Sequence, residues 1–297
     1  MRLITYQTNQ QTYLGALLGE QVLDLPAVQQ AATGERAFPT DMIALLNEGE
    51  AGLVRVASLI DWAESRPNDF RLPLGQVTLL PPVVRPGKVI ALGRNYAAHA
   101  KEGGAEPPDY PMLFHNTAGS LLGAGGTIII PPVTEQVDYE GELAIIMGRA
   151  CKQVSPEAAL DYVAGYTIAN DVSARDLQRR TSQFSAGKML DTFGPLGPAL
   201  VTRDEVPDPG HLSIRTILNG QVMQDDTTAN MIFDVPFTIS YISHIATLEV
   251  GDVILTGTPE GVGFARKPPV YMQDGDVVSV EIERLGVLTN KVGRQDL

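Results

Sequence analysis

The apolar and polar positions of the chain alternate over short stretches, and this pattern predicts more strands than helices. Near the N-terminus, residues 3–7, 13–18 and 21–25 are expected to form three strands, because β-branched and aromatic residues between turn residues are typical of strands. Residues 41–47 and 53–65 have apolar side chains at helical spacing and predict two helices. We find no group of catalytic residue types here and expect a role in packing or assembly.

A proline-rich joint follows this N-terminal part. Residues 79–87 read LLPPVVRPG, and such a stretch is extended and unable to continue a helix. We therefore predict a small N-terminal α/β domain over residues 1–80 and a larger domain over residues 86–297.

The larger domain is expected to consist mainly of strands. A hairpin is predicted where residues 212–218 and 221–224 flank Asn219-Gly220, a dipeptide favoured in type I′ turns. Residues 236–245 predict a helix, and residues 276–282 predict the last strand of the chain. Further strands are expected at residues 88–93, 111–114, 127–130, 162–169 and 252–255. The expected fold class is therefore α+β, predominantly β.

A strand predicted over residues 137–147 carries the first candidate site. Side chains alternate between the two faces of a strand, so Glu140 and Glu142 project on the same side. Such a pair is also typical of a solvent-exposed strand face, and the pair alone does not distinguish a metal site from such a face. Asp171 follows an equally apolar run, and a third carboxylate suggests an all-oxygen site for a hard divalent cation.

A short predicted helix over residues 96–102 carries the second candidate site. Asn95 is expected to cap its start, and Gly103-Gly104 to end it. His99 and Glu102 are then three residues apart on one helix face, where a carboxylate raises the basicity of an imidazole and fixes its tautomer. This pair predicts a general base, and the alternative is an incidental ion pair on an exposed turn.

Basic and amide side chains follow Asp171. Arg175, Gln178 and Lys188 are candidates for holding substrate carboxylates, because they come next to predicted acidic ligands. For Arg179 and Arg180 a solvated, charge-balanced loop is the favoured interpretation.

Composition and charge narrow the class of partner. Of the 297 residues 44% are hydrophobic and 19% charged, as in ordinary globular proteins. The net charge of −13 argues against nucleic acid and anionic membranes as partners. Cys151 is the single cysteine, so no intramolecular disulfide can form, and no apolar segment reaches the length of a membrane span. We expect a cytoplasmic protein.

Five motifs in order resemble those of the fumarylacetoacetate hydrolase family. They are G-R-N-Y-A-x-H-x-x-E at 93–102, D-Y-E-G-E-L at 138–143, N-D-V-S-A-R-D-x-Q at 170–178, D-T-F-G-P-L-G-P at 191–198 and T-G-T-P-x-G-V-G at 256–263. The resemblance implies mixed rolled β-sheets around a Mg²⁺ or Mn²⁺ site, and a homodimer. The chain departs from many family members at His115-Asn116, where they have lysine.

Carried over by position, the resemblance implies a role for each candidate residue. Glu140, Glu142 and Asp171 would hold the metal, and His99 with Glu102 would activate water. Lys188 would act in catalysis, while Arg175, Gln178 and Thr258 would contact the substrate.

The resemblance also implies the chemistry. The leading hypothesis is Mg²⁺-dependent hydrolysis of a C–C bond in an acylpyruvate-like 2-oxo acid of the fumarylpyruvate type, as in aromatic catabolism. The alternative is a decarboxylase or isomerase of 2-oxo dicarboxylates, of the oxaloacetate or 2-hydroxyhepta-2,4-diene-1,7-dioate type. The His99/Glu102 pair slightly favours hydrolysis or decarboxylation over simple tautomerisation. A catalytically silent binding protein is the remaining alternative, and retention of the predicted metal ligands and of His99 argues against it.

Overall fold

The computed structural model describes residues 1–66 and 69–295, and their N-terminal part combines five strands with three helices. The strands and helices predicted there are confirmed to within a few residues. The chain also forms a helix between β3 and α2 that the sequence pattern does not predict. The elements are β1 (Arg2–Thr8), β2 (Gln11–Leu18), β3 (Gln21–Asp24), α1 (Leu25–Thr33), α2 (Met42–Asn47), α3 (Gly49–Glu64), β4 (Arg71–Pro73) and β5 (Thr78–Leu80).

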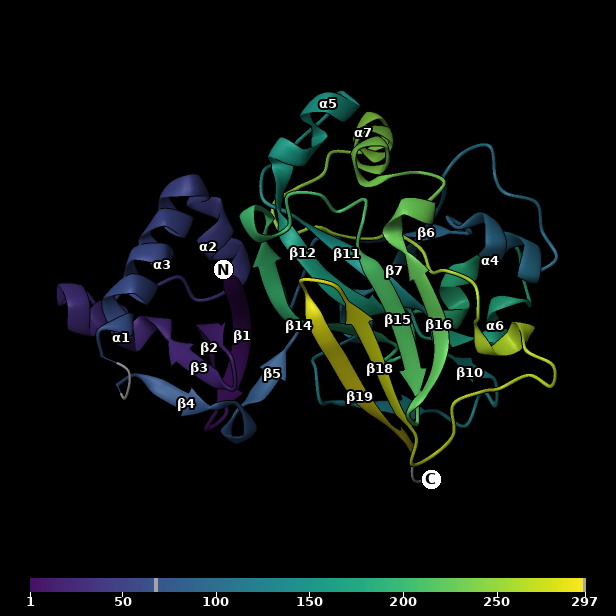
Figure 1. The fold of residues 1–297 in the computed structure, drawn as a ribbon, viewed down its shortest axis with the longest axis horizontal. Coiled ribbons are helices and arrows are strands. Elements are labelled where there is room, and N and C mark those ends of the chain that lie inside the picture. Colours follow the sequence, from purple (N-terminus) through teal and green to yellow (C-terminus); the bar gives the residue numbers. More distant parts are fainter. Residues whose placement is uncertain (67–68, 296–297) are drawn as a thin grey trace.

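One large mixed sheet runs through the whole chain. Its strand order is β4-β3-β2-β1-β14-β12-β11-β17-β6-β7, with β5 paired to β1 and β8 paired to β14. Figure 1 shows the N-terminal strands continuing into the central strands at the junction of β1 and β14. The further strands are β6 (Val89–Gly93), β7 (Met112–Asn116), β8 (Leu121–Leu122), β11 (Gly141–Met147), β12 (Val163–Asn170), β14 (Gly194–Thr202) and β17 (Val253–Leu255). The sheet thus crosses the line between residues 1–80 and 86–297, and the division into two domains stays a prediction.

The described part of the chain also contains a second sheet, four further α-helices and several short 3₁₀ helices. The sheet has the order β16-β15-β18-β19-β9, and a two-stranded ladder pairs β10 with β13. Their bounds are β9 (Thr127–Ile130), β10 (Val137–Asp138), β13 (Ser173–Ala174), β15 (Ser213–Leu218), β16 (Gln221–Thr227), β18 (Val277–Ile282) and β19 (Gly286–Arg294), and the helices are α4 (Ala97–Glu102), α5 (Pro156–Ala159), α6 (Arg175–Gln178) and α7 (Val235–Ile245). The predicted predominance of strands is confirmed.

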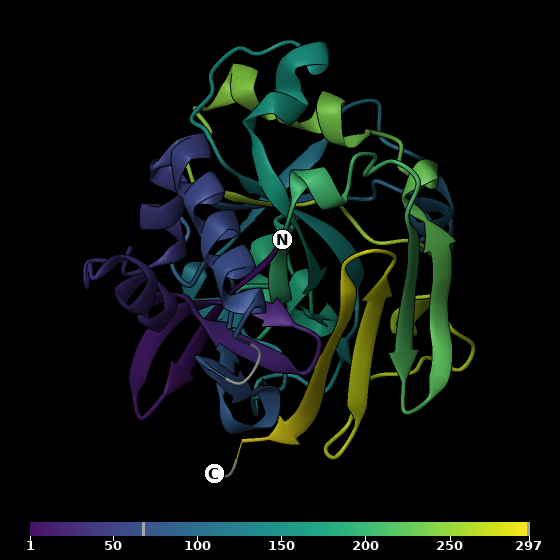
Figure 2. The ribbon, with the colours of Figure 1, turned by 60° about the vertical axis from the view of Figure 1, so that its left-hand side comes forward.

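Both faces of the central strands are covered. Ala144 and Ile146 of β11 share a core with Leu45 and Val56 of the N-terminal helices. Leu143 and Ile145 share another with residues of α7 and β18. Figure 2 shows the N-terminal helices on one side of the molecule and the second sheet on the other. Burial on both faces explains why the sequence of β11 is a continuous apolar run and not an alternating one.

The prediction of a single strand over residues 137–147 is wrong. The chain forms β10 and β11, joined through Tyr139 and Glu140. The backbone N–H of Tyr139 donates to the Asp138 carboxylate, and that of Glu140 donates to the Asn170 side chain. These side-chain acceptors replace a strand partner, so the chain passes from one ladder into another between the two acids.

The prediction that residues 276–282 form the last strand is also wrong, because β19 follows β18. Every second residue of β19 from Leu288 to Val292 is buried, but the middle one is the polar Asn290. Its amide donates to the carbonyl oxygens of Gly123 and Gly126. A polar residue at an inward position hides the alternation that marks a strand.

Other local predictions are confirmed. Asn219 and Gly220 both have positive φ angles, of 51° and 80°, as a type I′ hairpin turn requires. Helix α7 begins after Asp234, whose side chain accepts the N–H of Phe237. Within residues 1–66 and 69–295, no helix is long and apolar enough to cross a lipid bilayer.

Candidate active site

Antiparallel pairing brings the three predicted acidic ligands together. Glu140 and Glu142 flank the start of β11, Asp171 follows the end of β12, and Gly141 lies opposite Asn170 in the register of these strands. One carboxylate oxygen from each acid lies within 4.8 Å of the others, and all three side chains are buried. A Cβ atom at Gly141 would lie 2.3 Å from the Thr216 hydroxyl oxygen, so a glycine between the acids lets β11 pack against the second sheet.

Two buried cations contact this acidic cluster. The Lys188 ammonium lies 2.5 Å from Glu140 Oε2 and 2.6 Å from Asp171 Oδ2, and it donates to the Asp171 carbonyl oxygen. The Arg175 guanidinium lies 2.7 Å from Glu140 Oε1 and 2.8 Å from Asp138 Oδ2. Burial opposes ionisation of Glu140, but the charges of Arg175 and Lys188 outweigh it and lower its pKa to about 2.

Glu142 lies in a different electrostatic environment. Burial, together with the neighbouring charges of Asp171 and Glu140, raises its pKa well above the ordinary value. The backbone N–H of Gly257 donates to Glu142 Oε2 at 2.7 Å. The structure therefore holds this carboxylate in place, but the charged form lacks a cation of its own.

The charge balance fits a divalent cation. Four buried carboxylates, of Asp138, Glu140, Glu142 and Asp171, face the two buried cations of Arg175 and Lys188. When all four carboxylates are ionised, two negative charges remain uncompensated, and buried charge without compensation is costly. Carboxylate oxygens are the ligands that Mg²⁺ and Mn²⁺ prefer, so the donor set fits such an ion.

The charge balance predicts that metal stabilises the fold. Mg²⁺ or Mn²⁺ at about 100 times its Kd adds about 2.7 kcal/mol to the free energy of unfolding, because it binds only the folded state. In a chain of this size, thermal unfolding should show Tm raised by roughly 5–10 °C relative to the protein in EDTA. An unchanged Tm at millimolar concentrations of both ions would contradict the assignment of a metal site.

The raised pKa of Glu142 predicts how the metal-free protein responds to pH. A carboxyl group with a raised pKa holds its proton in the folded state over a range where the unfolded chain releases it. The stability of the metal-free protein should therefore fall as pH rises from the ordinary glutamate range through the raised pKa of Glu142. Urea unfolding in EDTA across this range measures the slope, which Glu142→Gln should reduce. A slope that Glu142→Gln leaves unchanged would show that another group causes it.

The predicted histidine–glutamate pair forms on α4. His99 Nδ1 lies 2.8 Å from Glu102 Oε1, while Glu102 Oε2 accepts the N–H of Gly261 at 2.9 Å. The loop that contains Gly261 thus holds the Glu102 carboxylate, and this carboxylate orients the His99 imidazole. His99 lines the same pocket as Glu140 and Glu142. Helix α4 ends at Gly103, as predicted.

The predicted capping role of Asn95 is wrong. Tyr96 is the N-cap residue of α4, and the Asn95 side chain makes no bond to the helix. Instead, its amide nitrogen donates to the carbonyl oxygens of Phe233 and Thr256, and its oxygen accepts the N–H of Phe233. Asn95 therefore ties together three segments behind the pocket, which explains its complete burial.

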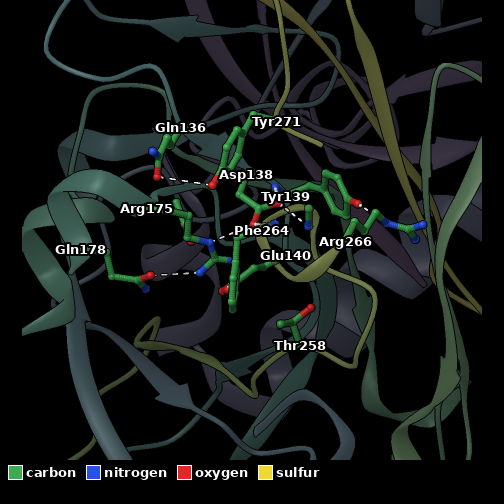
Figure 3. Close-up of polar contacts among 12 residues, drawn as sticks. Gln136, Asp138, Tyr139, Glu140, Arg175, Gln178, Thr258, Phe264, Arg266 and Tyr271 are labelled. Carbon is green, nitrogen blue, oxygen red and sulfur yellow. Dashed lines mark hydrogen bonds and ion pairs between the residues drawn. The ribbon is translucent and has the colours of Figure 1, made fainter. Parts of the chain in front are cut away.

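The remaining predicted residues also lie at the pocket. Arg175 Nη1 donates to Gln178 Oε1 at 3.0 Å, and Figure 3 shows both side chains beside Glu140 with Thr258 across from them. The Thr258 hydroxyl donates to the Gly141 carbonyl oxygen and accepts the amide of Gln224. Arg179 is exposed, but it lines the pocket as well, which the interpretation as a solvated loop does not anticipate.

Two further polar residues support the acids. Asn116, in the His115-Asn116 pair, donates to Asp171 Oδ1 at 2.7 Å. Asp138 accepts the N–H groups of Gly263 and Phe264 in addition to the Arg175 ion pair, so its oxygens are occupied outside the acidic cluster. Asn116 is the last residue of β7 and is buried, whereas the preceding His115 is exposed. The sequence signal at this place is the departure from the family pattern at His115-Asn116.

The pocket is small and polar at its base. Its volume is about 110 Å³, below the ~300 Å³ at which sites for drug-sized ligands begin. Phe114, Phe184 and Phe264 contribute apolar walls. The pocket can therefore enclose only a small molecule.

Comparisons with known proteins identify a family model and several relatives that match this chain. Residues 88–293 match the model of the fumarylacetoacetate (FAA) hydrolase C-terminal family. The chain is 45% identical over 276 residues to the Bos taurus protein "Oxaloacetate tautomerase FAHD2A, mitochondrial", covering 92% of this chain and 84% of that protein. It is 37% identical over 302 residues to "Oxaloacetate tautomerase YisK" of Bacillus subtilis (strain 168), covering 99% and 100%.

A solved structure has the same fold as this chain. Maleylpyruvate hydrolase from Sphingobium sp. SYK-6, in complex with manganese (II) ion and pyruvate, superposes with a TM-score of 0.78 at 32% identity, with 100% of both chains covered. This likeness extends over the N-terminal strands as well as the region around the acids, and it confirms the predicted fold.

Proposed function

The chain belongs to the fumarylacetoacetate hydrolase family, and on this premise we propose that it is a divalent-metal-dependent enzyme that interconverts the keto and enol forms of oxaloacetate. The observation that carries the proposal is near-complete alignment with proteins named oxaloacetate tautomerase, at 37% and 45% identity. The leading hypothesis from the sequence, hydrolysis of an acylpyruvate, takes second place. The alternative that included oxaloacetate is better supported.

Glu140, Glu142 and Asp171 would hold the metal. When bound, a divalent cation supplies a Lewis acid that stabilises negative charge on an oxygen of the substrate. The residues around it would orient the 2-oxo acid. Gln178 Oε1 is occupied by Arg175, and within the described residues its amide nitrogen has no protein partner, so it can donate to a substrate carboxylate.

His99 would move the proton that distinguishes the two tautomers. Its Nδ1 faces Glu102, so the tautomer with the proton on Nδ1 leaves the Nε2 lone pair for the substrate. Nε2 can take a proton from C3 of the keto form and return it to C3 of the enol form, while the C2 oxygen exchanges its proton with solvent. The C–C bonds stay intact, and no water molecule is consumed.

The small pocket supports the same assignment. Tautomerisation needs only the four carbons of oxaloacetate to be held near His99 and the acids, and the volume of about 110 Å³ suits a substrate of this size. Lys188 keeps its charge there: burial lowers its pKa, but Asp171 and Glu140 raise it further, so the net shift is upward. Its charge offsets part of the negative charge of Glu140 and Asp171, which would reduce the repulsion that an anionic substrate meets beside the acids.

Hydrolysis is the second candidate, because the His99/Glu102 pair could equally deprotonate a water molecule and a hydrolase of the family shares the fold. One experiment separates the candidates. Metal-loaded protein is mixed with enol-oxaloacetate and, separately, with fumarylpyruvate, while loss of enol absorbance and release of pyruvate are followed. The proposal predicts rapid enol loss without pyruvate release. Rapid pyruvate release from fumarylpyruvate, with enol loss at the uncatalysed rate, would replace it by the hydrolase assignment.

A further inference from the structure

We infer that Arg94 and Arg179 form a distal-anion site at the mouth of the pocket, which selects 2-oxo acids with a second carboxylate over those without one. The inference rests on the proposed function for the identity of the reacting half of the substrate. It gives a function to two arginines that take no part in metal binding, in proton transfer or in holding the 2-oxo acid group.

Among the residues that the structure describes, four arginine and lysine side chains line the pocket, and they fall into two pairs. Lys188 and Arg175 are buried and already ion-paired with the acids. Within residues 1–66 and 69–295, neither Arg94 nor Arg179 has an ion-pair partner, and their side chains contact aromatic rings instead. In a chain with a net charge of −13, two arginines that line one pocket and have no carboxylate partner among the described residues can bind an anionic ligand.

The aromatic contacts orient both guanidinium groups. The Arg179 guanidinium lies 4.3 Å from the centroid of the Phe264 ring, and that of Arg94 lies 5.9 Å from the centroid of Phe184. A guanidinium held against a ring keeps its N–H donors free, and these donors match a carboxylate in bidentate geometry. The Arg175 guanidinium lies 4.6 Å from the centroid of the same Phe264 ring, so this ring contacts both the exposed Arg179 and the buried Arg175.

The backbone of Arg94 provides a second, independent observation. Its φ angle is +56°, in the left-handed region that arginine rarely adopts. Glycine would take this conformation without strain, and asparagine with little. Strained backbone is typical of functional sites, and Arg94 lines the pocket immediately after β6. We therefore expect the Arg94 side chain to have a function in the pocket.

A 2-oxo dicarboxylate carries a second negative charge, which needs a partner in the pocket. One carboxylate of a 2-oxo dicarboxylate belongs with the 2-oxo group near the acids, so the other must lie elsewhere in the pocket. Arg175 and Lys188 cannot neutralise it without giving up their own ion pairs. Arg94 and Arg179 are the pocket cations that remain, and a monocarboxylate such as pyruvate would leave them unpaired.

The test compares oxaloacetate with its 4-methyl ester, which keeps the 2-oxo acid and removes the distal charge. Arg94→Gly and Arg179→Ala should each lower kcat/KM for oxaloacetate roughly ten- to hundredfold, mainly through KM, as expected for loss of a charge-assisted hydrogen bond. Turnover of the ester should change less than about twofold, since such a bond is absent there. Arg180→Ala is the matched control, because Arg180 is exposed and does not line the pocket, and it should leave both substrates unaffected.

Thermal unfolding excludes a folding defect, because Arg94→Gly removes backbone strain and should keep or raise Tm. Calorimetric titration of the Mn²⁺-loaded protein gives a readout that does not depend on turnover. The wild type should bind oxaloacetate at least tenfold more tightly than the ester, and both variants should lose this difference. Equal affinities in the wild type, or a preference that survives in both variants, would overturn the inference even if tautomerase activity is present. A different outcome would overturn the proposed function alone: the wild type prefers oxaloacetate over the ester and both variants lose this preference, but the wild type has no tautomerase activity.

Discussion

His99→Ala should lower kcat for oxaloacetate tautomerisation by roughly 10²- to 10⁴-fold, the usual contribution of a positioned general base. The metal affinity should stay the same, because His99 contacts Glu102 and not the acidic cluster. Stopped-flow loss of enol absorbance measures the rate, and Mn²⁺ titration measures the affinity.

His211→Ala is the matched control for this variant. His211 also pairs with a carboxylate three residues away, that of Asp208, but it lies on the surface with 75% of its side chain exposed. Its substitution should leave kcat unchanged. If His99→Ala retained wild-type kcat, the proton-transfer step would have to be assigned to another residue.

Glu140→Gln should destabilise the metal-free protein and Glu142→Gln should not, although both abolish metal-dependent turnover. The pKa of Glu140 falls from 4.5 to about 2, which corresponds to about 3 kcal/mol of stabilisation at neutral pH. Glu140→Gln removes this contribution and leaves Lys188 and Arg175 each with one partner fewer. We expect it to lower the free energy of unfolding by a similar amount.

Glu142→Gln should not destabilise the metal-free protein. The pKa of Glu142 is raised by burial and by Asp171 and Glu140, so its charged form is a cost to the fold, and glutamine can still accept the Gly257 N–H. Urea unfolding of both variants in EDTA at neutral pH tests the pair. Equal destabilisation by the two substitutions would show that the charge distribution within the cluster differs from the one described here.

The outcome of sequence analysis depends on how far apart the interacting residues lie. The hairpin at Asn219-Gly220 and helix α2 after Asp41 follow from signals within a few neighbouring residues, and both form as predicted. Glu140, Glu142 and Asp171 can be proposed as a cluster because each follows or precedes a strongly apolar run, and ordered motifs favour one use for all three.

Distant contacts explain what sequence analysis misses. Asn95 looks like a helix cap, but its partners Phe233 and Thr256 lie 138 and 161 residues further along the chain. Arg179 looks like a surface residue until the loop that carries Phe264 folds against it. No local pattern contains this information, because each contact is created by the assembly of separate strands and loops.

The two functional hypotheses differ in what happens at one carbon atom. A tautomerase exchanges the C3 hydrogen of oxaloacetate with solvent while leaving the carbon skeleton intact, whereas a decarboxylase or hydrolase breaks a C–C bond. On the proposed function, the acids and His99 in the pocket would serve both reactions, so the product decides between them.

Proton NMR of oxaloacetate in D₂O with catalytic amounts of the Mg²⁺-loaded protein tests the central claim most directly. The account predicts that the C3 signal disappears much faster than in buffer, that pyruvate forms at the uncatalysed rate, and that EDTA or His99→Ala abolishes the acceleration. C3 exchange at the uncatalysed rate, with or without pyruvate formation, would contradict it.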